Sequence, residues 1–154
     1  MSGRMLVVAA LAAATIVAAG LFVELGRSGG SSDAPSAVPA QLPGELDGPP
    51  PWPRNGSQLA QRLVVLRLPA LGSEGTALHI HEHVDVFVDG KRVMVPAGIG
   101  IDPGGRFISP LHTHDTSGVI HVESPTVRPF TFGEFFGVWG VPLRAPLRVF
   151  VDGR

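Results

Sequence analysis

The stretch "LHIHEHVDVFVDGK", residues 78–91, decides the fold because it joins an alternating strand pattern to a turn signal. Asp-Gly at 89–90 is a favoured two-residue connection between antiparallel strands, so we expect a β-hairpin here. The register of that hairpin places valines opposite one another on a single face. The predicted cross-strand pairs are Val88 with Lys91, Val86 with Val93, and Val84 with Val95.

The opposite face of the same strand is rich in histidine. Successive side chains on a strand point to alternate faces, so the residues between the valines share the second face. That face carries His79, His81, His83 and Asp85, with Met94 across from Asp85. The stretch therefore predicts an apolar core face and a separate histidine face.

A second stretch, "PLHTHDTSGVIHVES" at residues 110–124, repeats this arrangement. A tight turn at "DTSG" would place His112 opposite His121, and His114 opposite Val119. Glu123 then joins the imidazoles, and the aliphatic residues lie on the other face. All six histidines of the chain fall within residues 79–121, which favours a shared role over scattered surface positions.

Strand geometry limits which histidines can share one metal ion. Same-face neighbours lie roughly 7 Å apart, and a zinc–imidazole bond is about 2.0–2.1 Å, so residues i and i+2 can reach one ion but i and i+4 scarcely can. His79 and His83 are therefore not expected to share an ion. We expect one site of three or four imidazoles, with a second ion left open, drawn from His81 with His79 or His83 and from His112, His114 and His121.

Carboxylates near these histidines are candidates to ligate the ion or to orient a liganding ring. Asp115 and Glu123 are the stronger candidates. Asp85 and Glu82 are weaker, because Glu82 has the parity of the core face and is expected at a sheet edge. Met94 offers a soft ligand for Cu(I), although packing is the more common role of a methionine.

The amino-acid composition limits the kinds of binding or catalytic site that the chain can form. The chain has no cysteine, which excludes disulfides, thiolate sites and cysteine nucleophiles, and its formal net charge of −1 gives no indication of a nucleic-acid partner. Imidazole-rich sites without thiolate suit copper or zinc. The predicted cofactor is therefore a copper or zinc ion.

The N-terminus has the pattern of a membrane segment. The run from Met5 to Val23 holds 19 residues without a charge, close to the roughly 20 that a spanning helix needs. Arg4 would stay in the cytoplasm by the positive-inside rule, with the remainder of the chain outside. We expect an uncleaved, single-pass signal anchor over residues 1–26; cleavage near Gly20, before Leu21, would instead give a secreted protein.

The remainder divides into a linker and one domain. Residues 27–57 are dense in Pro, Gly and Ser and predict a disordered tether, in which Trp52 is expected to be solvated. Residues 58–154 predict a mainly β domain, a small antiparallel sandwich or open barrel. Its last residues, "VFVDGR" at 149–154, nearly repeat "VFVDGK" at 86–91. The second copy has no return strand after its Asp-Gly turn, which predicts either an edge strand or a missing final strand. The expected strands lie at 62–68, 84–88, 92–96, 118–124 and 147–151.

One short helix is expected in "TFGEFFGVWG", residues 131–140. Thr131 and Glu134 form a capping box, and Gly140 is placed to end the helix. The aromatic residues that follow share one helical face, which is typical of a helix packed on a sheet. That aromatic face consists of Phe132, Phe135, Phe136 and Trp139.

These blocks resemble a family of membrane-anchored exported proteins without an assigned activity, whose pattern runs H-x-H-x-H, L-H-T-H-D-x-[ST]-G-x-I-H-x-E-S and T-[LF]-G-[DE]-F-F-x-x-W-G. The resemblance covers most of residues 78–140 and implies membership and an exported location. A partial likeness to the cupin metal motif rests on "HIH" and "GVIH". The glutamate that cupins carry after the first histidine pair is absent, and Thr116 stands where they usually have proline.

Three functions follow as hypotheses. The first is a membrane-anchored metal-binding protein on the extracytoplasmic side. The second is a metalloenzyme with an open coordination position, in which Glu123 or Asp115 would serve as general base. The third is an accessory domain that contacts a membrane protein through the aromatic helix, which requires Phe135, Phe136 and Trp139 to be exposed. The sequence holds no established catalytic motif that would decide between binding and catalysis.

Overall fold

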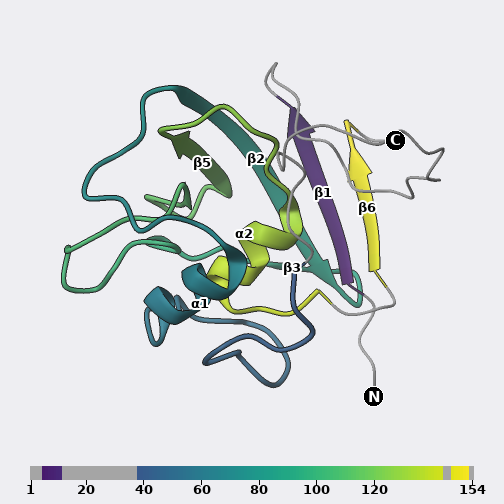
Figure 1. Cartoon of the computed structure of the whole chain (residues 1–154). Coiled ribbons are helices and arrows are strands. Elements are labelled where there is room, and N and C mark those ends of the chain that lie inside the picture. Colours follow the sequence, from purple (N-terminus) through teal and green to yellow (C-terminus); the bar gives the residue numbers. More distant parts are fainter. Residues whose placement is uncertain (1–4, 12–37, 144–146, 153–154) are drawn as a thin grey trace, which may run out of the picture.

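The computed structural model describes residues 5–11, 38–143 and 147–152. Within these ranges the chain forms one six-stranded sheet and two short helices (Figure 1). The strands follow the spatial order β4-β5-β2-β1-β6, and β3 pairs with β2 beside this path. The elements are β1 (Met5–Leu11), α1 (Leu59–Leu66), β2 (Leu78–Val88), β3 (Lys91–Val93), β4 (Leu111–His112), β5 (Val119–Ser124), α2 (Phe132–Trp139) and β6 (Leu147–Val151).

The mainly β prediction is confirmed, but its finer form is not. The described strands belong to a single open sheet, not to the two packed sheets of a sandwich. The sheet is also mixed, because β1 runs parallel to β6 while the other pairs are antiparallel. The described part of the chain holds two short helices, where one was expected in the domain.

Strand β2 organises the sheet. Its first half pairs with β5 and its last residues pair with β3, while β1 lies along the other edge. The predicted hairpin is confirmed: Asp89 and Gly90 both have positive φ, and Val86 lies opposite Val93. The predicted pair Val84–Val95 falls beyond the end of β3, because the Val84 N–H donates to the Gly118 carbonyl instead. The turn that leads into β5 thus occupies that part of the β2 edge.

Helix α1 corrects the predicted strand at 62–68. Val64 and Val65 favoured a strand, yet Val64 is 77 % exposed on the outer side of a helix. The buried residues recur at spacings of three and four, which is the period of a helix. They are Leu59, Arg62, Leu63 and Leu66.

Helix α2 forms where the sequence predicts it. The Thr131 hydroxyl accepts a hydrogen bond from the Glu134 N–H, the Glu134 carboxylate accepts one from the Thr131 N–H, and Gly140 ends the helix with positive φ. Phe135, Phe136 and Trp139 are buried against the sheet and α1. Burying these rings drives the helix onto the sheet. They are therefore core residues, and an accessory contact through an exposed aromatic helix loses its basis.

The predicted N-terminal segments are described only in part. Met5–Leu11, the first residues of the predicted membrane segment, form β1 between β2 and β6, and residues 12–37 lie outside the described part of the chain. No helix within the described ranges has the length and apolar character needed to cross a membrane. Of the predicted linker, residues 38–57 are described. Leu42 is buried, and Trp52 contacts Trp139 edge-to-face with ring centroids 6.0 Å apart.

A buried arginine joins this segment to the helices. Arg62 is fully buried in α1, and its guanidinium donates to the carbonyls of Pro43, Asn55, Ser57 and Val138. Burial lowers the pKa of Arg62 to about 10, so the side chain stays charged at neutral pH. The carbonyl dipoles, including one at the C-terminal end of α2, compensate the buried charge.

Replacing Arg62 should destabilise the domain strongly. Arg62→Met keeps the stem of the side chain but leaves several buried carbonyls without a donor, so the free energy of unfolding should fall by about 3 kcal/mol or more. Urea unfolding would measure the change. The exposed Arg67 at the end of the same helix supplies the control, and Arg67→Met should stay within about 0.5 kcal/mol of the unmodified chain. Equal losses in the two variants would contradict this role of Arg62.

Candidate metal centre

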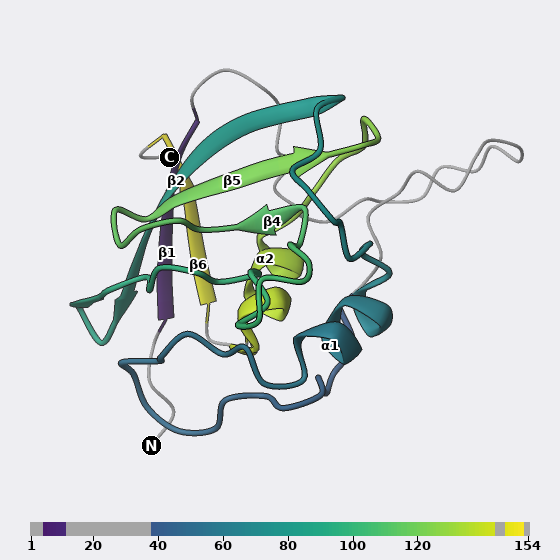
Figure 2. The same cartoon turned by 90° about the vertical axis from the view of Figure 1, so that its left-hand side faces the viewer.

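The two histidine stretches meet because β2 and β5 are neighbours. The strands pair antiparallel, with His81 opposite His121 and His79 opposite Glu123. Strand β4 pairs on the far edge of β5 and places His112 opposite His121, as the sequence predicted. Figure 2 shows β4, β5 and β2 side by side. His81, His121 and His112 thus form a row across three strands, where directly opposed side chains are close enough to interact.

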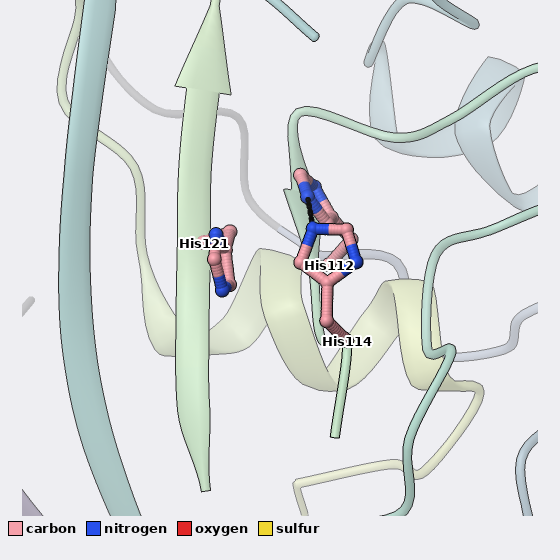
Figure 3. A group of neighbouring side chains, drawn as sticks. All are labelled: His112, His114 and His121. Atoms are coloured by element: carbon pink, nitrogen blue, oxygen red, sulfur yellow. Dashed lines mark hydrogen bonds between the residues drawn. The ribbon is translucent and has the colours of Figure 1, made fainter.

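Three of the imidazoles form one compact group, His112, His114 and His121. Their ligand nitrogens all lie within 4.8 Å of one another. His112 Nε2 and His114 Nε2 are 3.2 Å apart, close to the roughly 3.3 Å expected between two ligands bonded at about 2.0–2.1 Å in a tetrahedral site. Figure 3 shows the three rings converging on one side of the sheet, with α2 behind the strands.

His112 is held in one orientation. Its side chain is fully buried, and its Nδ1 lies 3.0 Å from the Ser109 carbonyl. Because a carbonyl only accepts, Nδ1 carries the proton and Nε2 presents a lone pair toward His114. Burial is the main cause that lowers the pKa of His112, to about 4, and the Glu123 carboxylate opposes it. The neutral ring, which is the form that binds a metal, is thus favoured at neutral pH.

The surrounding loop encloses His112. The Gly98 N–H donates to the Thr113 carbonyl, and the Ile99 N–H donates to the Thr113 hydroxyl. Gly100 packs so closely that a Cβ there would lie 2.3 Å from the Leu111 carbonyl oxygen. A side chain at this position would force the loop away from β4.

Glu123 lies beneath the imidazoles and is only 2 % exposed. Its Oε1 lies 3.1 Å from His121 Nδ1 and 3.4 Å from His79 Nε2. Its Oε2 has no hydrogen-bond partner and lies 3.8 Å from His112 Nε2. A buried carboxylate oxygen without a donor is costly, so the site favours a cation beside Glu123.

A second group consists of His79, His81 and Glu123, whose ligand atoms also lie within 4.8 Å of one another. His81 Nε2 lies 3.0 Å from His121 Nδ1, which brings the second group against the first. Burial and the neighbouring His121 lower the pKa of His81. The neutral form of His81, which is the form that binds a metal, is therefore favoured.

A third group adds a residue that the sequence analysis missed. Glu74, in the loop before β2, forms a group with His112 and Glu123, and its Oε1 lies 3.5 Å from His114 Nε2. Nothing in "LGSEGTA", residues 71–77, distinguishes Glu74 from an ordinary loop carboxylate. Gly75 allows this loop to approach the end of β5 closely, because a Cβ there would lie 2.3 Å from the Ser124 backbone.

The structure separates other predicted candidates from these groups. His83 is directed away, with its Nε2 3.0 Å from the Ser117 carbonyl. Asp115 accepts from the Ser117 N–H, and hydrogen bonding to the Ser117 side chain and then to this N–H lowers the pKa of Asp115. Asp85 pairs with Arg92, and Met94 is 61 % exposed. Among the described residues, none of His83, Asp115 and Asp85 belongs to a candidate metal group.

Glu82 corrects a further expectation. It was expected at a sheet edge, but β2 is flanked on both sides and Glu82 is 2 % exposed. Burial raises the pKa of Glu82 to about 7, with a further contribution from Asp152. It has the parity of the core face, opposite to that of the histidines.

The fold and site together define a β-sheet domain with an imidazole-rich candidate metal centre. The chain matches no family model, no curated protein and no solved structure.

The buried state of His112 predicts a pH dependence of stability. Its pKa is lower in the folded chain than the ordinary 6.5, so the unfolded chain takes up the proton first as the pH falls. The stabilising contribution is complete above pH 6.5 and is lost between pH 6.5 and about 4, by up to about 3 kcal/mol. Urea unfolding of chelator-treated protein across this range would measure it.

A matched pair of variants isolates this effect. His112→Gln removes the titrating ring and keeps an N–H donor for Ser109, so its stability should fall less steeply between pH 6.5 and 4. His83→Gln, at a half-exposed position, should retain the slope of the unmodified chain. Identical slopes for His112→Gln and the unmodified chain would refute the assignment.

Proposed function

We propose that this chain is a membrane-anchored, extracytoplasmic protein that binds copper or zinc. The observation that supports metal binding most directly is the group of His112, His114 and His121. Their ligand nitrogens lie within 4.8 Å of one another, and the tautomer of the buried member is fixed by the Ser109 carbonyl. Ligands that are positioned before the ion arrives lose less conformational freedom on binding.

The donor set is the reason for proposing copper or zinc. Three imidazoles with a nearby carboxylate suit Zn(II) and Cu(II), and the affinity order places copper first at equal availability. Calcium and magnesium require oxygen-rich sites, which this group does not offer. The absence of cysteine makes a thiolate site impossible.

The openness of the site favours exchange of the ion over a purely structural role. His112 and Glu123 are buried, whereas His114 and His79 are 45 % and 50 % exposed. A cleft of about 420 Å³ lies beside His114 and is lined in part by Glu74 and Phe107. Structural zinc sites are normally closed by protein ligands, whereas this centre has one accessible side. We therefore favour a protein that buffers, senses or delivers the ion.

A metalloenzyme is the second candidate. Glu123 holds a buried carboxylate oxygen without a hydrogen-bond partner beside the imidazoles, which is the placement of a general base acting on a metal-bound water. Asp115 is a weaker candidate for that base, because it accepts from the Ser117 N–H and lies outside the metal groups. A spectroscopic test for an exchangeable water ligand in the cobalt-loaded protein would separate an open site from a closed one.

The anchored location is proposed from the uncharged run at 5–23 and the preceding Arg4. Residues 5–11 of this run form β1, and the same residues cannot lie in the sheet and in the bilayer at once. In an anchored chain they would leave the sheet. The proposed location does not depend on the metal chemistry.

Loss of an exposed ligand should weaken metal binding without unfolding the domain. His114→Ala should reduce the affinity for Zn(II) by at least about 100-fold, beyond the 10–100-fold typical of residues that only orient a ligand. Titration against a competing chelator would measure it. His83→Ala, on the same face but outside the groups, should bind as the unmodified chain does; equal affinities for all three proteins would contradict the proposed centre.

The anchor predicts that the full chain stays with membranes after carbonate extraction. Arginine near the centre of a spanning helix costs about 2.5–3.5 kcal/mol per residue, so Ala14→Arg combined with Ile16→Arg should move the protein to the soluble fraction. Val64→Arg, at an exposed position of α1, should not change the distribution. Extraction of the unmodified chain into the soluble fraction would show that residues 5–23 do not anchor it.

A further inference from the structure

We propose that the histidine face holds two metal ions bridged by the Glu123 carboxylate. One ion would be held by His112, His114 and His121, and the second by His79 and His81. This inference rests on the proposed metal binding and adds a second ion, a shared ligand and a stoichiometry to it.

Glu123 lies between two sets of imidazoles. Its Oε1 lies 3.1 Å from His121 Nδ1 and 3.4 Å from His79 Nε2, and its Oε2 lies 3.8 Å from His112 Nε2. Glu123 belongs to one candidate metal group with His79 and His81 and to another with His112 and Glu74. A carboxylate shared by two candidate groups has the arrangement of a bridge between two ions. One ion in the first group would leave the imidazoles of the second group without a cation.

His121 shows how close the two groups are. Its ring centroid lies 4.4 Å from that of His81 and 4.5 Å from that of His114. Ions in the two groups would therefore be near neighbours, and two-metal sites typically hold their ions about 3.5–4 Å apart. At that separation an anionic bridge is needed to offset the repulsion between two cations.

The charge balance of Glu123 supports the same conclusion. The carboxylate is 2 % exposed, and within the described residues its ion pairs are with imidazoles, namely His79, His112 and His121. Its Oε2 has no hydrogen-bond partner, and its distance of 3.8 Å from His112 Nε2 is too long for a hydrogen bond. A buried carboxylate is costly without a cation on either side. Two bound ions would satisfy both of its oxygens.

Glu74 gives the first ion an additional oxygen ligand. Its carboxylate is half exposed and lies 3.5 Å from His114 Nε2 at the accessible side of the cluster. With Glu123 and Glu74, two carboxylates would partly neutralise two divalent ions. The second ion lacks such a partner apart from Glu123, so its retention should depend on Glu123 most strongly.

Zinc stoichiometry of the full chain, purified in detergent, tests the proposal. Equilibrium dialysis against Zn(II) followed by elemental analysis should give two ions per chain. His79→Ala combined with His81→Ala should give one, and Glu123→Gln, which keeps the shape of the side chain, should weaken the second ion by at least about 100-fold. His83→Ala should still bind two.

Each other result has a defined meaning. One zinc ion in the unmodified chain would overturn the two-ion proposal but leave the proposed metal binding intact, whereas no zinc would overturn both. Two ions in the His79→Ala/His81→Ala variant, or an unchanged second ion in Glu123→Gln, would overturn the assignment of these residues. Loading with Cu(II) gives an independent readout, because neighbouring ions should broaden or diminish the EPR signal. Two sharp, independent copper signals would exclude the bridge.

Discussion

The register between β2 and β5 is the constraint on which the rest of the molecule depends. With His81 opposite His121, every second residue of both strands falls on the histidine face, and Val84, Val86, Ile120 and Val122 fall on the core face. A slip of one residue would exchange the two faces and bury the imidazoles under α2. The hydrophobic core and the candidate centre therefore specify the same pairing, each from its own side of the sheet.

Much of this arrangement could be predicted because it is local. Period-two alternation and the Asp-Gly turn define the β2–β3 hairpin, and the capping box defines α2, all within short stretches of chain. The meeting of the two hairpins could not be derived, since His81 and His121 are 40 residues apart and no local pattern specifies non-local pairing. Helix α1 was misjudged because Val64 and Val65 favour strands, whereas tertiary burial of its other face decided the outcome.

The sequence predicted the types of residue in the candidate site better than it predicted which individual residues belong to it. Parity alone placed His83 with His81, but the Ser117 carbonyl holds the His83 ring away from the cluster. Glu74 was missed because it enters from a loop, where no periodicity marks a ligand. Glu123 was identified by its parity, yet its burial and its position between two imidazole groups follow only from the enclosing loop and β4.

The row of His81, His121 and His112 has a mechanical consequence. Its members come from three adjacent strands, so ions bound across the row would act as cross-links between β2, β5 and β4. Such a link closes a long loop of chain and restricts the unfolded state, in the way that a disulfide does in proteins that contain one. In a domain without cysteine, the ions would take the place of disulfides as cross-links of the sheet. The stability of the sheet against strand separation would then increase with the concentration of free metal ion.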